Sequence, residues 1–125
     1  MKIPEAFDAA LRTFAPRGEP WDQSNYVINS MRDYGDDWDS NGATAPPAGV
    51  VDAALALSAA IRAAGLPCPQ CTGAGPNGTV TMEWHQGAEW FEVEVIEPGR
   101  AEWSHLTRTE EGTYSGPSCV GFSLD

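Results

Sequence analysis

Basic side chains are scarce in this chain of 125 residues, where seven Lys and Arg residues stand against eighteen Asp and Glu residues. The formal net charge is −11 with both His neutral. Binding to nucleic acid needs clustered Lys and Arg at the phosphates, and an anionic membrane surface attracts the same residues. The composition therefore argues against direct binding to either of them.

Long apolar runs are missing as well. Residues 1–18 carry one Lys and no apolar run of the length that a signal peptide or a membrane span requires. The three Cys are an odd number, so a secreted disulfide framework would leave one thiol unpaired. We therefore expect a cytoplasmic protein with reduced thiols and no membrane partner.

Signatures of catalysis are also absent. The chain has no Gly-x-Ser-x-Gly, no Gly-x-x-x-x-Gly-Lys phosphate loop and no His-Glu-x-x-His, and it has only two His. These absences favour a binding protein over an enzyme, and no cofactor is expected.

The first half of the chain carries a helical pattern. Apolar residues recur at helical spacing in three segments, which predicts helices over Pro4–Ala15, Trp21–Tyr34 and Pro47–Ala64. The third segment stops at Gly65, which suits the left-handed residue that closes a helix. Its apolar stripe is rich in Ala, so this helix can pack flat on a sheet.

After Gly78, the spacing of apolar residues changes from the helical pattern to every second residue. Thr79–His85 and Trp90–Ile96 alternate apolar and polar side chains, which predicts two half-buried strands. A two-residue turn at Gly87 and Ala88 fixes one register for the pair. That register puts three apolar pairs on one face: Trp84 with Phe91, Met82 with Val93, and Val80 with Val95.

Two more strands are expected after this hairpin. Ala101–Leu106 would bury Trp103 together with either His105 or Leu106. Gly112–Leu124 would add an edge strand.

The expected fold class is α+β. Helices come first and strands later, which is typical of an antiparallel meander with two to three helices packed on one face. We expect three to four strands in a single domain, 1–125, with a helical part over about 1–66, a connector over 67–77 and a sheet over about 78–125. The connector is rich in Pro and Gly, and no regular element is expected in it.

The most unusual segment is the acidic loop over 35–43. Four residues match positions 1, 3, 5 and 6 of a calcium loop, where alternate oxygens converge on the ion: Asp37, Asp39, Asn41 and Gly42. Position 12, which should supply a bidentate Glu, is Ala48. A weak calcium or magnesium site is therefore one interpretation. The favoured one is a loop in which Asp39 and Asn41 bond to the local backbone.

The same loop carries a resemblance. Residues 31–105 resemble a group of short bacterial proteins. These proteins share a Trp-Asp-x-x-Gly-Ala loop, then a helix, then strands of which the first closes with Glu-Trp. In this chain the loop motif is Trp38 to Ala43, and the Glu-Trp pair is Glu83-Trp84. The resemblance implies a common fold and a bacterial or phage origin, and it assigns no catalytic residue.

A Cys-x-x-Cys pair, Cys68 and Cys71, stands in the connector. Such a pair can supply two zinc thiolates, but a closed site needs four ligands, and only His85, His105 and Cys119 could complete it. A thioredoxin-like pair would begin a helix that follows a strand, whereas this pair follows a predicted helix. Reduced cysteines in a loop are the favoured interpretation, with zinc ahead of redox chemistry.

The polar face of the predicted hairpin gathers five residues: Glu83, His85, Trp90, Glu92 and Glu94. Glu83 would face Glu92, and two opposed carboxylates can raise one pKa toward that of a general acid, or can hold a cation. A solvated acidic face is the plainest interpretation. A protein-binding surface is the third, with the Trp as anchor and the charges steering a basic partner.

The sequence therefore predicts a small acidic protein-binding or regulatory module, such as an inhibitor, an antitoxin or an immunity-type protein, whose partner is another protein with a basic surface. Two alternatives stay open. One is a metal-binding protein, enzymatic or not, with Ca or Mg at Asp37–Asn41 or Zn at Cys68 and Cys71; the other is a mimic of nucleic-acid charge. A homodimer, through an open sheet edge or the amino-terminal helix, is a further arrangement.

Overall fold

Helices precede a sheet along the chain, as the sequence predicts. The computed structural model describes residues 1–16 and 20–125. Within them the elements follow in this order: α1 (Glu5–Leu11), α2 (Trp21–Ser30), the 3-10 turn η1 (Met31–Asp33), α3 (Ala48–Ala63), β1 (Cys71–Ala74), β2 (Val80–Gln86), β3 (Glu89–Glu97), β4 (Arg100–Arg108), β5 (Tyr114–Ser115) and β6 (Val120–Ser123). The α+β prediction is confirmed. None of the described helices combines the length and apolar character that crossing a membrane would take.

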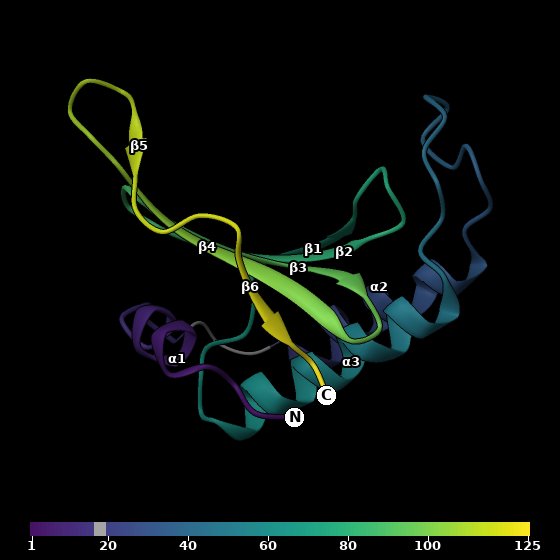
Figure 1. The fold of residues 1–125 in the computed structure, drawn as a ribbon, viewed down its shortest axis with the longest axis horizontal. Coiled ribbons are helices and arrows are strands. Elements are labelled where there is room, and N and C mark those ends of the chain that lie inside the picture. Colours follow the sequence, from purple (N-terminus) through teal and green to yellow (C-terminus); the bar gives the residue numbers. More distant parts are fainter. Residues whose placement is uncertain (17–19) are drawn as a thin grey trace.

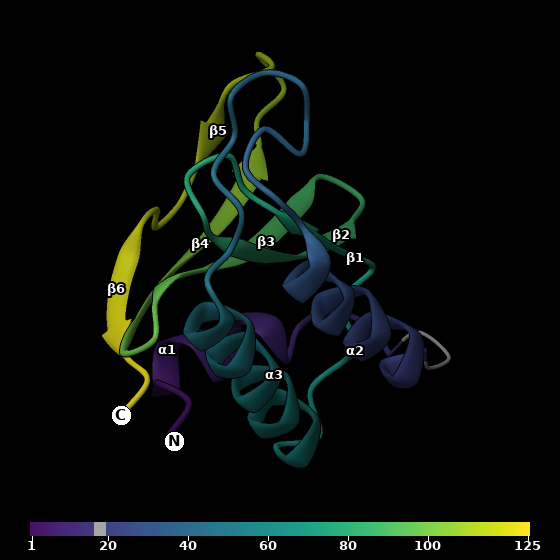
Figure 2. The ribbon, with the colours of Figure 1, turned by 90° about the vertical axis from the view of Figure 1, so that its right-hand side faces the viewer.

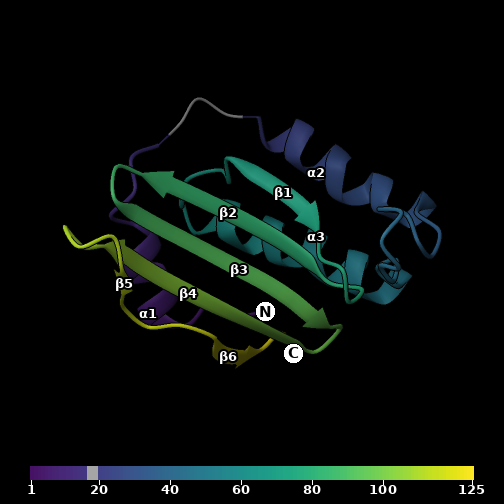
Figure 3. The ribbon, with the colours of Figure 1, turned by 90° about the horizontal axis from the view of Figure 1, so that it is seen from above.

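The helices lie on one side of the sheet. α1 and α3 lie against one face, and α2 packs along α3 beside the β1 edge (Figure 1, Figure 2). Seen from the other side, the sheet is crossed by no helix of the described residues (Figure 3). We call this uncovered side, which carries Glu83, Glu92 and Ser104, the outer face.

The β2–β3 hairpin has the register that the sequence predicts. The three apolar pairs on the helix-covered face are Val80–Val95, Met82–Val93 and Trp84–Phe91. Gly87 in the two-residue turn has a φ of 58°, a conformation that glycine adopts without a Cβ clash. Turn chemistry and alternation therefore select the same pairing.

The expectation that the connector holds no regular element is wrong. β1 lies inside it and pairs antiparallel with β2, from Cys71 opposite Glu83 to Ala74 opposite Val80. The prolines of this segment flank the strand instead of interrupting it. A strand at a sheet edge needs ladder bonds on one side only, so a short Gly-containing segment can form one.

The edge strand expected in Gly112–Leu124 is present as two short strands. Both β5 and β6 pair with β4. In the segment between β5 and β6, the carbonyl oxygen of Pro117 accepts the N–H of His105 in β4 at 2.8 Å, and Gly116 has a φ of 138°. Proline has no N–H to continue a ladder, so the strand is divided there.

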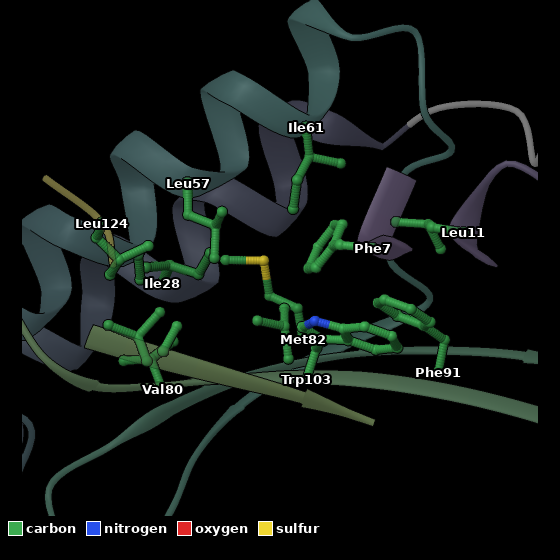
Figure 4. Packing of buried hydrophobic residues seen from close by; sticks show 14 of the residues in the cluster. Phe7, Leu11, Ile28, Leu57, Ile61, Val80, Met82, Phe91, Trp103 and Leu124 are labelled. Atoms are coloured by element: carbon green, nitrogen blue, oxygen red, sulfur yellow. The ribbon is translucent and has the colours of Figure 1, made fainter. Parts of the chain in front are cut away.

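The core fills the space between the helices and the sheet (Figure 4). Phe7 of α1 meets Phe91 edge to face with ring centroids 5.0 Å apart, and Phe91 stacks on Trp103 at 5.6 Å. Leu57 and Ile61 of α3 are fully buried over the same sheet. The Ala-rich stripe of α3 therefore faces the sheet, as its composition indicates.

His105, and not Leu106, joins the buried side of β4. The His105 ring lies 5.8 Å from Phe14 and 6.1 Å from Phe91, centroid to centroid. Leu106 pairs with Trp90 across β3 and β4, which puts it on the outer face. The sequence alone left the choice between His105 and Leu106 open. Its outcome has a functional consequence, because Leu106 adds an apolar side chain to the uncovered side of the sheet.

Candidate functional site

The five residues predicted to share the polar face of the hairpin do share it. Glu83 is paired with Glu92, His85 with Trp90, and Glu94 follows Glu92 on the same side of β3. Their alternation with buried apolar residues places them on the outer face, away from the helices. This face is the candidate site.

Two residues of the site were missed by sequence reasoning. Trp90, Glu92, Leu106 and Tyr114 line a shallow hollow of about 300 Å³ on the outer face. Leu106 comes from β4, and Tyr114 comes from β5, where it pairs with Arg108. The alternation in Ala101–Leu106 could have indicated Leu106. Nothing local indicates Tyr114, whose place depends on a two-residue strand.

Glu92 lies at the centre of this arrangement and is half-buried. Burial raises the pKa of Glu92 above its ordinary value, and the facing charge of Glu83 and the neighbouring charge of Glu94 raise it further. The indole N–H of Trp90 donates to Glu92 Oε2 at 3.3 Å, which favours the ionised form and opposes the shift. The expectation that the opposed pair perturbs one carboxyl agrees with this direction.

The other polar side chains of the face are held by neutral or weakly basic neighbours. His85 Nε2 lies 3.5 Å from Glu83 Oε2, and the His85 ring stands edge-on to Trp90 with centroids 4.0 Å apart. Thr79 Oγ1 donates to Glu94 Oε2 at 2.7 Å. These contacts orient the two carboxylates, and neither of them comes from Lys or Arg.

Four arginine side chains form ion pairs with acidic groups other than Glu83, Glu92 and Glu94. Three of them pair with acidic groups on the helices: Arg12 with Asp8, Arg32 with Asp52, and Arg62 with Asp22. Arg100 lies 3.5 Å from Glu102, which is paired with Glu94 across β3 and β4. Within residues 1–16 and 20–125, no Lys or Arg forms an ion pair with Glu83, Glu92 or Glu94. The centre of the outer face thus carries concentrated negative charge.

The acidic loop uses its carboxylates on its own backbone. Asp37 Oδ1 accepts the N–H of Gly42 at 2.6 Å. Asp39 Oδ1 accepts those of Asn41 at 2.9 Å and Ala43 at 3.1 Å. These are the local bonds of the favoured interpretation. The calcium or magnesium alternative at Asp37, Asp39 and Asn41 stays a prediction.

The two cysteines of the Cys-x-x-Cys pair differ in environment. Cys68 is buried and its thiol donates to the carbonyl oxygen of Pro69 at 3.5 Å, whereas Cys71 is exposed on β1 opposite Glu83. Among the described residues, no group of three or more His, Cys, Asp or Glu side chains is arranged to hold a metal ion. Zinc at Cys68 and Cys71 therefore rests on their spacing alone.

Two further hollows lie at the sides of the sheet. One, of about 260 Å³, lies between α2 and β1 and is lined by Ser24, Val27 and Cys71 among others. The second, of about 240 Å³, lies between Phe14 and His85. Neither has an acidic residue in its lining, as the hollow over Glu92 does.

Comparisons of the chain with protein-family models, with curated proteins and with solved structures found no match. The resemblance carried by the Trp38–Ala43 loop stays a prediction.

Proposed function

We propose that this domain is an acidic binding module that engages a basic surface of another protein through the outer face of its sheet. Its most concrete form is an inhibitor, antitoxin or immunity-type protein that covers the working surface of its target. The observation that carries this proposal is the apolar hollow of Trp90, Leu106 and Tyr114, set among carboxylates on a face that no described helix covers.

The charge of the face supports a partner of opposite sign. Glu83, Glu92 and Glu94 lie together without an ion pair to Lys or Arg in the described part of the chain, and the whole chain carries a net charge of −11. Such a field speeds encounter with a basic protein and repels acidic ones. Its effect is screened by salt, which gives the proposal a direct test.

The apolar side chains support a protein as the partner. Tyr114 is 55% exposed, and Trp90 and Leu106 are half-buried beside it. Trp and Tyr are enriched among the residues that carry most of the binding energy in protein interfaces, usually within a polar rim. A nucleic-acid-binding protein is one kind of basic partner, so mimicry of nucleic-acid charge is a special case of this proposal.

The experiment begins with capture of the partner by tagged protein from its native cells at low and at high salt. The captured protein is then purified, and its affinity for the domain is measured by calorimetry. Reversal of two charges of the outer face, Glu92→Lys with Glu94→Lys, is expected to weaken binding by about tenfold or more. The control is Glu5→Lys with Asp33→Lys, which changes the net charge equally on exposed helical positions.

Loss of affinity in the outer-face variant alone, with circular dichroism unchanged, supports the proposal. Equal affinity of the outer-face variant and the unaltered protein would overturn it. An equal loss in both variants would also overturn it, because binding would then depend on net charge and not on this face.

A further inference from the structure

The hollow on the outer face has a definite chemical character. It is lined by two aromatic residues, Trp90 and Tyr114, by the apolar Leu106 and by one acidic residue, Glu92. A volume of about 300 Å³ lies at the lower limit of small-ligand pockets, so it suits a single side chain.

The carboxylates select the charge of the occupant. Glu92 lines the hollow, Glu83 faces it across β2 and β3, and Glu94 follows it on the same side of β3, so the acidic residue of the hollow has two acidic neighbours. In the described residues, the carboxylate of Glu92 accepts one hydrogen bond, and its donor is the indole N–H of Trp90. A cation that donates to Glu92 would relieve the repulsion between the two facing carboxylates.

The aromatic walls select the kind of cation. A guanidinium group is planar, weakly hydrated and able to lie against Trp or Tyr rings while its N–H groups reach a carboxylate in pairs. An ammonium group is a compact and strongly hydrated charge, and it loses more on leaving water for a half-buried site.

We propose that this hollow receives an arginine side chain of the basic partner, with its guanidinium group on Glu92 and its stem and plane against Trp90, Leu106 and Tyr114. The inference rests on the proposed function and names the contact through which the outer face anchors its partner. Arg108 borders the site, since it follows Leu106 on the same side of β4 and pairs with Tyr114. Its charge opposes the incoming guanidinium and limits the affinity of the free site.

The test uses the intact domain and three short peptides, Ac-Gly-Xaa-Gly-amide with arginine, lysine or citrulline in the centre. Binding is followed by the indole N–H signal of Trp90 in nitrogen-15 correlation spectra, identified by its loss in Trp90→Phe. The arginine peptide is expected to shift this signal in a saturable way, with a dissociation constant in the millimolar range that suits so small a ligand. Lysine should bind several-fold more weakly, and citrulline, which is neutral and of similar shape, should not bind.

Variants separate the site from general attraction to an acidic protein. Glu92→Gln keeps the shape of the side chain and should weaken arginine binding by about tenfold. The matched control is Glu97→Gln, at an exposed position of the same strand, which should leave binding unchanged. Arg108→Gln removes the opposing charge and should strengthen binding.

The outcomes are distinct from those of the partner experiment. A saturable shift that is lost in Glu92→Gln and kept in Glu97→Gln supports the inference. An equal response to lysine or citrulline, or no saturable response to arginine, overturns it. In that case the proposed function still stands if the captured partner is released by the Glu92→Lys and Glu94→Lys reversals.

Discussion

Removal of the Phe7 ring is the sharpest test of how the helical layer is attached to the sheet. Phe7 has 0% exposure and meets three aromatic rings edge to face, those of Phe91 at 5.0 Å, Phe122 at 5.6 Å and Trp103 at 6.3 Å. Truncation of a buried Phe to Ala costs about 3–5 kcal/mol, and aromatic contacts place this site toward the upper end. Because total stabilities are about 5–15 kcal/mol, Phe7→Ala should remove about a quarter or more of the folding free energy.

The assay is urea unfolding followed by tryptophan fluorescence, with a thermal melt by circular dichroism. A loss of about 4 kcal/mol corresponds to a fall in melting temperature of about 12–25 °C for a domain of this size. Phe7→Leu keeps part of the apolar volume and should cost only about 1–2 kcal/mol, so it remains measurable if the Ala variant is unfolded. Glu5→Gln, at an exposed position of the same helix, is the control. A loss below about 1 kcal/mol in Phe7→Ala would refute the packing of α1 on β3, β4 and β6.

Three other substitutions test the sheet and its loops. Trp84→Phe removes the indole N–H that donates to the carbonyl oxygen of Pro67 at 2.9 Å, and should cost about 1–2 kcal/mol in urea unfolding; no change would mean that the bond adds nothing. Asp39→Ala removes the acceptor of two backbone N–H groups and should cost about 1 kcal/mol, and calcium should not raise the melting temperature of the unaltered protein; a rise with calcium that is lost in Asp39→Ala would favour the metal alternative. The pKa of Glu92 is raised in the folded state, so the native protein binds this proton more tightly than the unfolded chain, and stability falls as the pH rises from the ordinary value of Glu through the raised one. The melting temperatures of the unaltered protein and of Glu92→Gln are measured across that pH window. The part of the fall that Glu92 causes should be absent from Glu92→Gln, and the same pH dependence in both proteins would contradict the burial of Glu92.

The hairpin could be predicted because two independent signals agree. The alternation of Val80, Met82 and Trp84 with polar residues fixes the faces, and the Gly87-Ala88 turn fixes the pairing. A shift by one residue would expose all the apolar side chains, so no other register competes. The same register brings Glu83 and Glu92 together, which is why the acidic half of the candidate site was predictable.

The apolar half of the site was not predictable in the same way. Tyr114 reaches the hollow through β5, a strand of two residues that exists only because it pairs with β4. β1 escaped prediction for a related reason, because a short edge strand gains its order from β2 and not from its own composition. Elements that depend on partners distant in sequence leave little local signal.

The facing carboxylates separate a binding surface from a face that is acidic only for solubility. Like charges directly opposite one another weaken the free sheet, and solubility needs neither their opposition nor the burial of Glu92. Glu83→Lys would turn the repulsion into an attraction worth about 0.2–1 kcal/mol, so it should raise the melting temperature of the free domain. If the face binds a basic partner, the same change should weaken association, because the ammonium group of the new Lys would then occupy the position of a cationic side chain of the partner. Stability and binding that move in opposite directions would mark a face selected for its partner, whereas a stabilised variant with undiminished binding would leave solubility as the role of these carboxylates.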